Sequence, residues 1–484
     1  MAILTRPART DRPRTPDGPA ADPSAPTSPS TSSTTTVLAA ALLAFFVISL
    51  DGSVVNVALP AISHSLGGTM ADLQWIVDGY TLMFAAFMLS AGTFSDRIGA
   101  SRAYAWGLAS FTVASLACGV APNLGTLIGA RMVQGGAAAL MVPASLALIR
   151  QTYTDPGKRA RAIAIWTAAG SVAVAVGPVI GGMLTSGLSW RAVFYLNLPV
   201  GALGLALLTR IAPSPRRAAP VDLLGQLSVV ASLAGLTYAV IEGGRAGWGS
   251  ADVLGTLALA AVAIAVFVTT QSRREQPMVP LSIFKNRTVV VCLAAGFTIN
   301  AVFYGAIFLL GMYFQQVRGA SPVSTGAMFI PMCALISIVN MAGVKLAARK
   351  GAWVPMAIGQ LVMTAGSVLM LTVTSSTSYW IPVLLLVPIG LGGGLAVPSL
   401  TAAILENIDG DRAGTAAAVL NTFRQVGSCI AVAAFGALIA DTSHFQQGMD
   451  TSFVISVVML LATAAATALF LPRLTNRPSE NTKA

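Results

Sequence analysis

Apolar runs separated by short polar segments repeat along almost the whole chain, from about residue 37 to about residue 472. A helix needs roughly 20 apolar residues to cross the hydrocarbon core of a bilayer. The runs have that length, so they predict an all-α polytopic membrane protein. Fourteen spanning helices are expected, at residues 37–60, 74–95, 102–121, 125–149, 161–186, 190–211, 222–242, 251–271, 288–315, 322–347, 353–375, 379–403, 414–440 and 451–472.

The composition excludes an ordinary soluble protein. Of the 484 residues, 55% are hydrophobic and 10% are charged, whereas about 25% of residues are charged in a soluble domain. All four cysteines lie inside apolar runs, and none belongs to a C-x-x-C pair. We interpret them as small buried hydrophobic residues, and we expect no metal site.

The net charge of +11 could indicate nucleic-acid binding, but such proteins gather their basic residues on one face or in one arm. In this chain the Lys and Arg residues are concentrated in alternate loops. The loops on the opposite side hold only Arg191, Arg245 and Arg318. Because cytoplasmic loops of membrane proteins are enriched in Lys and Arg, both chain ends are expected in the cytoplasm, and no nucleic-acid partner is expected.

Residues 1–36 differ from the rest of the chain because they are rich in Pro, Ser, Thr, Ala and Arg. They offer too little apolar surface to offset the entropy lost on ordering, so we expect a disordered cytoplasmic arm. The arm and the apolar run that follows it are both too long for a secretory signal peptide.

The first spanning run contains a carboxylate, Asp51. An Asp near the middle of a spanning helix costs about 2.5 to 3.5 kcal/mol on insertion scales, and such residues usually serve proton, ion or substrate sites. The functional hypothesis is therefore a proton-exchanging group. The alternative is a structural Asp whose oxygens are satisfied by the neighbouring backbone or by Asn56.

Asp78 and Arg131 are further charged residues in predicted spans. Trp75 and Tyr80 flank Asp78, and such aromatic residues are common at a membrane interface, so Asp78 is expected near the outer surface. Arg131 lies in the outer half of the fourth span, so the three charged side chains are expected at similar depth. The alternative for Asp78 is a solvated charge at a helix end.

Two glycine-containing segments stand out in the first half of the chain. The segment Gly92 to Arg102 brackets a short charged turn with two glycines, which allow the positive backbone dihedrals of a tight turn. In the fifth span, small residues recur at Gly170, Ala173, Gly177 and Gly181. Such a stripe lets two helices pack closely, and the neighbouring Pro178 is expected to bend the helix.

The second half contains no Asp or Glu inside its spans. Its polar residues instead lie on one face of the thirteenth span, because Asn421, Arg424, Gln425 and Ser428 follow helical spacing. One interpretation is a substrate-binding face. The alternative is that Arg424 ties this helix to a neighbour.

Several segments together carry a resemblance to a known family. They are the turn Gly92 to Arg102, the segment Arg131 to Gly135, the stripe Gly170 to Gly182, Leu50-Asp51 to Asn56-x-Ala58-Leu59-Pro60, Trp75-x2-Asp78-x-Tyr80 and Trp190-Arg191-x2-Phe194-x2-Asn197-x-Pro199. In this order they resemble the signature segments of the major facilitator superfamily. With fourteen spans, the chain is similar to the fourteen-helix drug:proton antiporters, and it looks most like the export and self-resistance pumps of antibiotic-producing actinomycetes, such as methylenomycin resistance pumps.

The resemblance implies a 6 + 2 + 6 arrangement in a bacterial cytoplasmic membrane. Six-helix bundles would occupy residues 37–211 and 288–472, two inserted helices residues 212–287, and a cytoplasmic tail residues 473–484. The protein is expected to be a monomer that contacts membrane lipid.

The resemblance also implies proton-coupled export of an antibiotic or another amphipathic compound, without a cofactor beyond the proton gradient. The expected proton-coupling residues are Asp51, Arg131 and Asp78. The expected substrate pathway comprises Asn56, Asn421, Arg424, Gln425 and Ser428. The expected cytoplasmic gate comprises Gly92, Asp96, Arg97, Gly99 and Arg102. The expected outer seal, the antiporter seam, comprises Gly170, Gly177, Pro178, Gly181 and Gly182.

The substrate is expected to be neutral, zwitterionic or anionic, since the second half has no membrane-embedded acid and Arg424 is available to a carboxylate. Two other functions remain open: a nutrient importer or uniporter with the same fold, and a non-transporting receptor. An ATP-driven pump is not expected, because the chain has no G-x4-G-K-[ST] phosphate loop. An enzyme is not expected either, because His64 and His444 have no recognisable catalytic partners.

Overall fold

The computed structural model describes residues 31–216, 222–408 and 413–471, and the regular elements of these residues are all helices. The first seven are α1 (Thr31–Leu66), α2 (Met70–Ile98), α3 (Ala100–Gly119), α4 (Leu124–Thr152), α5 (Pro156–Gly187), α6 (Ala192–Tyr195) and α7 (Asn197–Leu208). The middle of the chain forms α8 (Leu223–Ala246), α9 (Ala251–Arg273) and the 3-10 helix η1 (Leu281–Lys285). The last part forms α10 (Arg287–Met312), the π-helical turn η2 (Tyr313–Val317), α11 (Pro322–Met328), α12 (Ile330–Lys350), α13 (Trp353–Met370), α14 (Trp380–Glu406), α15 (Ala413–Leu438), the 3-10 helix η4 (Thr442–His444) and α16 (Phe445–Phe470).

Each predicted span coincides with helical structure, but some boundaries differ. α1 begins at Thr31, which corrects the predicted start at residue 37; residues 1–30 of the expected arm and the expected tail at 473–484 lie outside the described residues. The predicted span 190–211 consists of α6 and α7. The span 322–347 is divided into α11 and α12, with Pro331 in the first turn of α12, a position where its missing N–H is not needed.

Twelve helices of the described chain are long and apolar enough to cross a membrane. The third predicted span, α3, is not among these twelve, and the sixth corresponds to the shorter apolar segment Ala192–Leu208. The structure therefore establishes an all-helical polytopic architecture, and the count of fourteen spans stays a prediction.

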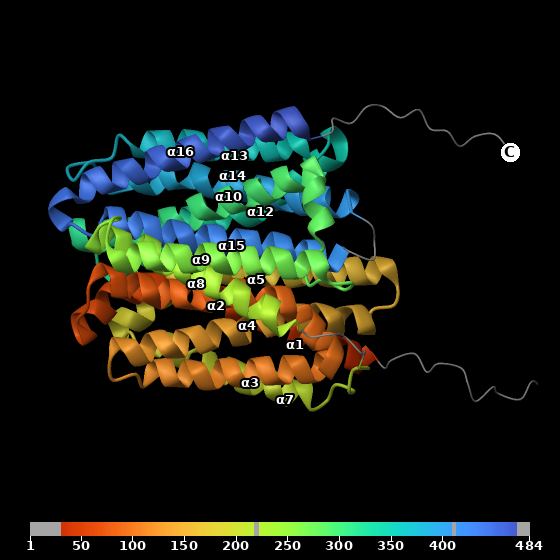
Figure 1. The fold of residues 1–484 in the computed structure, drawn as a ribbon. Coiled ribbons are helices and arrows are strands. Elements are labelled where there is room, and N and C mark those ends of the chain that lie inside the picture. Colours follow the sequence, from red (N-terminus) through yellow and green to blue (C-terminus); the bar gives the residue numbers. More distant parts are fainter. Residues whose placement is uncertain (1–30, 217–221, 409–412, 472–484) are drawn as a thin grey trace, which may run out of the picture.

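The helices lie side by side and run along one common direction (Figure 1). The start of α1 and the end of α16 lie at the same end of the bundle (Figure 1), which we call the terminal end. We call the opposite end, where α1 gives way to α2, the far end. The packed pairs of the first half include α1 with α5, α2 with α4 and α3 with α4, and those of the second half include α10 with α15, α12 with α14 and α13 with α14.

The buried apolar side chains form two clusters that show how the halves meet. The larger cluster joins α1 residues from Leu50 to Ile62 with residues of α10 and α13 to α16. The smaller cluster contains only residues of the first half, including α1 residues from Val37 to Ile48. The two halves therefore share one core at the far end, whereas the first half has a core of its own at the terminal end.

The helices α8 and α9 lie between α2 and α15, across the middle of the view in Figure 1. α8 packs against both of these helices: the Gln226 side chain donates to the carbonyl of Ala86 on α2 at 3.1 Å, and the Thr237 hydroxyl lies 3.4 Å from the Cys429 thiol on α15. At the base of the pair, Asp222 accepts a hydrogen bond from Gln271 at 2.6 Å. α8 thus contacts both halves of the chain.

Candidate functional site

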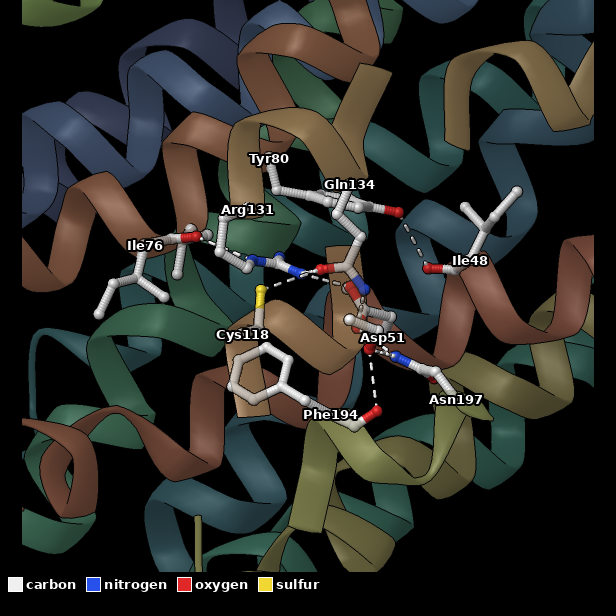
Figure 2. Close-up of polar contacts among 12 residues, drawn as sticks. Ile48, Asp51, Ile76, Tyr80, Cys118, Arg131, Gln134, Phe194 and Asn197 are labelled. Carbon is white, nitrogen blue, oxygen red and sulfur yellow. Dashed lines mark hydrogen bonds and ion pairs between the residues drawn. The ribbon is translucent and has the colours of Figure 1, made fainter. Parts of the chain in front are cut away.

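Asp51 is the centre of a buried polar cluster. It lies on α1 and is 1% exposed. Its Oδ2 atom forms an ion pair with Arg131, and its Oδ1 atom accepts hydrogen bonds from Gln134 at 3.1 Å and from Asn197 at 2.7 Å. Figure 2 shows these side chains converging on the carboxylate from α1, α4 and α7. The partners are therefore side chains of other helices and not the neighbouring backbone or Asn56, and the proton-exchanging role of Asp51 stays a prediction.

Arg131 is held as firmly as its partner and is also 1% exposed. Its Nε donates to the carbonyl of Ile76 at 3.1 Å, and one terminal nitrogen donates to Gln134 at 2.8 Å. The guanidinium lies over the Tyr80 ring, 4.2 Å from the ring centroid, which is a favourable cation–π distance. A buried ion pair is stabilised by further hydrogen bonds to its donors and acceptors, and here both Asp51 oxygens and the Nε of Arg131 have such partners.

Close packing of α4 on α2 places Arg131 where it can reach Ile76. A Cβ atom on Gly135 would lie 2.9 Å from the Cα of Tyr80, so only glycine allows the two helices to come this close. Gly135 therefore allows α4 to approach α2 closely enough for Arg131 to reach the carbonyl of Ile76.

Two residues of the cluster were not predicted as site residues. Gln134 has a sequence signal, because it lies one helical turn after Arg131. Asn197 lies 146 positions after Asp51. The sequence feature that could have indicated it is its place in the segment Trp190 to Pro199, which contributes to the family resemblance. Its side chain also donates to the Ser115 hydroxyl at 2.9 Å, which fixes the amide toward Asp51.

Asp78 does not join the Asp51 cluster. It is completely buried, so the alternative of a solvated helix-end charge does not apply. Within the described residues neither carboxylate oxygen has a hydrogen-bond partner. Its polar neighbour is the Cys429 thiol of α15, so Asp78 lies where the two halves and α8 meet.

The seam of small residues on α5 makes two contacts. On one side it packs against α1, where a Cβ on Gly181 would lie 2.7 Å from the carbonyl oxygen of Val54. Gly177 faces Ser53 and Gly170 faces Phe45 at distances that also exclude a larger residue. The stripe therefore brings α5 and α1 together, as its spacing predicts.

The other side of the seam meets the second half of the chain. A Cβ on Gly182 would lie 2.8 Å from the Cα of Val323 on α11, and Gly326 of α11 in turn abuts the backbone of Pro178. At the same end of the bundle, Gln74 of α2 donates to the carbonyl of Val432 on α15 at 3.1 Å. These contacts close the far end between the halves.

The charged turn at Gly92 to Arg102 lies at the terminal end. Gly99 has a φ of +92°, as expected for a tight turn, whereas a Cβ on Gly92 would meet no atom within 4 Å. The side chains of Asp96, Arg97 and Arg102 form no hydrogen bond or ion pair among residues 31–216, 222–408 and 413–471. The structure therefore shows no ion pair that would latch these gate residues to one another.

The polar face of α15 packs against α10. The Arg424 Nε donates to the side-chain oxygen of Asn300 at 3.1 Å, and Asn300 lies 3.4 Å from the Ser428 hydroxyl. Arg424 also lies 3.4 Å from the Asn421 side-chain oxygen. The bond to Asn300, which was not predicted as a site residue, agrees with the alternative in which Arg424 links two helices.

Arg424 has no carboxylate partner in the described part of the chain. Gln425 of the same face is half-buried. On α1, the Asn56 amide donates to the carbonyl of Gly52 in its own helix at 3.0 Å. The five residues predicted for the substrate pathway therefore divide into a group on α15 and an isolated side chain on α1.

Comparison with known proteins finds relatives among bacterial resistance and export proteins. The methylenomycin A resistance protein of Streptomyces coelicolor is 37% identical over 411 residues, which are 85% of this chain and 86% of the relative. The multidrug resistance protein Stp of Mycobacterium tuberculosis is 37% identical, covering 82% of this chain and 74% of the relative. The tetracenomycin C resistance and export protein of Streptomyces glaucescens is 33% identical, with 84% and 76% covered.

The fold is similar to that of a POT family transporter crystallised with 5-aminolevulinic acid, with a TM-score of 0.67 and 13% identity over 91% of this chain and 96% of that chain. The sequence also matches the model of the Major Facilitator Superfamily over residues 41–432. The chain therefore belongs to the major facilitator superfamily of membrane transporters.

Proposed function

We propose that this protein exports an antibiotic or another amphipathic small molecule across the bacterial cytoplasmic membrane in exchange for protons. The observation that carries the proposal is the buried Asp51–Arg131 pair, a titratable carboxylate inside the bundle with all its partners in place. The relatives support the cargo, since their names describe antibiotic resistance, multidrug resistance and export.

The proposed topology has fourteen spans, arranged 6 + 2 + 6, with both termini in the cytoplasm. The described chain ends lie at one end of the bundle, as an even number of crossings requires. The segment Ala192–Leu208 and α3 would supply the two spans beyond the twelve long apolar helices. α7 packs against both α1 and α3, as a member of the first bundle would.

Asp51 would couple the two transport directions by gaining and losing one proton. Burial favours the neutral form of a carboxyl group, and a nearby cation favours the charged form. Protonation of Asp51 from the outside would break its ion pair and leave Arg131 with its existing contacts to Tyr80 and Ile76. Rocking of the halves would then expose the site to the cytoplasm, where the proton leaves.

The driving force is adequate for uphill export. One charge crossing a potential of about 100 mV gains roughly 2.3 kcal/mol, in addition to any pH gradient. Asp78 would act as an accessory carboxylate, because it is buried without a hydrogen-bond partner among the described residues. Its site between α2 and α15 would change whenever the halves move.

Alternating access needs a gate at each end. The far end is closed by the α5–α11 contact, to which Gly182 contributes directly. At the terminal end, Asp96, Arg97 and Arg102 would form their latch when the halves close there, and Gly92 and Gly99 would give the turn its freedom. With the termini in the cytoplasm as proposed, the closed far end would face the outside.

The proposed substrate is neutral, zwitterionic or anionic. Arg424 supports this class, because the described chain offers its guanidinium no carboxylate and an anionic substrate group would be its counter-ion. Asn421, Gln425 and Ser428 would add polar contacts on the same face, and Asn56 would contribute from α1.

The function is tested by expression in a bacterial host that lacks its own drug exporters. We expect higher resistance to at least one compound in an antibiotic panel and lower intracellular accumulation of that compound. A proton uncoupler should restore accumulation to the level of the empty vector. Accumulation above the empty-vector level would instead favour the importer, and an unchanged level for every compound and metabolite would favour the non-transporting receptor.

Asn197→Ala tests whether the amide positions the Asp51 carboxylate. The variant loses the 2.7 Å hydrogen bond, and removing one partner of a hydrogen bond to a buried charged group costs about 1.5 to 3 kcal/mol. We therefore expect the pH at which export is half-maximal to shift, while Asn197→Asp shifts it further. A pH profile of export in membrane vesicles that matches the wild-type profile would contradict this role.

A further inference from the structure

A hollow of about 430 Å³ opens at the terminal end of the bundle, beside the α2–α3 turn. It is lined by Arg97, Ile98, Arg102, Trp106 and Arg216. None of the three arginine side chains has an ion-pair partner in the described chain. Because like charges repel, three uncompensated guanidinium groups around one hollow indicate a site for an anion.

The hollow is held in shape by hydrogen bonds among Ser101, Ser214 and Gln151. The Ser101 N–H donates to the Ser214 hydroxyl at 3.1 Å, and the Ser214 N–H donates to the Ser101 hydroxyl at 2.9 Å. The Ser214 hydroxyl in turn donates to Gln151 at 2.7 Å. Gly99 completes the contact, since a Cβ there would lie 2.8 Å from the Ser214 carbonyl oxygen. These bonds fix Arg216 next to the α2–α3 turn.

The wall of the hollow continues into an exposed apolar face of α3. Trp106 is 58% exposed, and Val113, Leu116 and Val120 are exposed along the same stripe of the helix. An exposed apolar stripe on a helix of a membrane protein faces acyl chains, and Trp is enriched where such a helix meets the headgroups. In the fourteen-span topology proposed above, the hollow would lie at the level of the lipid phosphates.

We propose that this hollow binds the phosphodiester headgroup of an anionic membrane lipid. Arginine recognises phosphate oxygens through paired N–H donors, and basic pockets between spanning helices on the cytoplasmic side suit anionic headgroups. The volume lies in the range of small-molecule pockets, about 300 to 1,000 Å³. The acyl chains would lie along the α3 stripe below Trp106.

The test uses the purified full chain in detergent micelles, with dioleoyl phosphatidylglycerol and dioleoyl phosphatidylcholine as probes. Native mass spectrometry reports how much of each lipid is retained. We expect phosphatidylglycerol to be retained preferentially, and Arg216→Gln to weaken its binding about fivefold, as one arginine near a lipid surface predicts. Arg216→Lys should recover part of the loss, and Trp106→Leu should weaken binding without removing a charge.

The matched control is Arg349→Gln, which removes one charge just before Gly351, a turn glycine with a φ of +88°. It should bind phosphatidylglycerol as the wild type does. Inorganic phosphate in millimolar excess should not displace the lipid; displacement would assign the site to a soluble anion and overturn the proposal. Equal binding by the wild type and Arg216→Gln would overturn it as well. The assay requires no transport, so its outcome is independent of the proposed export.

Discussion

Asp51→Asn is expected to abolish uphill export while leaving the protein in the membrane. The substitution keeps the shape of the side chain and one acceptor oxygen, but it removes both the negative charge and the ability to carry a proton. Resistance in the exporter-deficient host should fall to the empty-vector level. In vesicles, an imposed pH gradient should no longer drive the cargo.

Downhill exchange of the cargo distinguishes lost coupling from lost folding. Asp51→Asn should still exchange internal for external cargo, because this movement needs no net proton transfer. Breaking a buried ion pair on one side costs about 3 to 5 kcal/mol of stability, so the melting temperature must be measured alongside. Proton-driven export by the variant at the wild-type rate would exclude Asp51 as the coupling group.

Asp441→Asn provides the matched control for loss of a carboxylate. Asp441 is exposed and lies between α15 and α16. A hydrogen bond from Ser443 and a weaker contribution from His444 lower the pKa of Asp441 to about 2. Asp441 therefore stays ionised throughout the pH range in which export is measured. This variant should export with the wild-type pH profile.

Gly182→Val is the second substitution with a large expected effect. The added side chain would collide with α11, where even a Cβ would lie 2.8 Å from the Cα of Val323. Overpacking costs about 1 to 3 kcal/mol, which shifts an equilibrium between two states roughly 5- to 150-fold. The far end would stay open, and export should fall to background although the cargo still binds from outside.

Labelling of a cysteine at position 315 reports the far end directly. Gln315 is half-buried and donates across the halves to the carbonyl of Val57 at 3.1 Å. In a Gln315→Cys background, a membrane-impermeant maleimide should label the Gly182→Val variant faster than the parent. Gly187→Val is the control, because a Cβ at Gly187 meets no atom within 4 Å. Export by Gly182→Val at the wild-type rate would show that Gly182 has no role in the outer gate.

The positions of the helices could be predicted from the sequence. A run of about 20 apolar residues forms a helix in a bilayer, because its backbone groups must bond to one another there. The sequence was less informative about the ends of helices. Thr31 to Thr36 lack apolar side chains, yet they extend α1, since a long helix continues through residues of modest propensity. The break between α6 and α7 at Leu196 could not be predicted either, because the apolar run continues through it.

The partners of Asp51 show what one chain cannot reveal. The similar depth of Asp51 and Arg131 could be predicted from their positions in the spans. Their contact could not, because the two residues are 80 positions apart in the chain, and Asn197 is 146 positions from Asp51. Asp78 has a similar depth by sequence, yet it turns toward Cys429 on α15. The direction of a side chain around its helix depends on packing with distant helices, which periodicity alone does not specify.

The position of α8 makes the two flanks of the transporter unequal. α8 binds Ala86 on one half and approaches Cys429 on the other, so rocking must shear these contacts. On the opposite flank α5 faces α11 and α12 without an inserted pair. One flank is therefore tied across the halves by α8, whereas the other is held by direct contact between α5 and the helices α11 and α12.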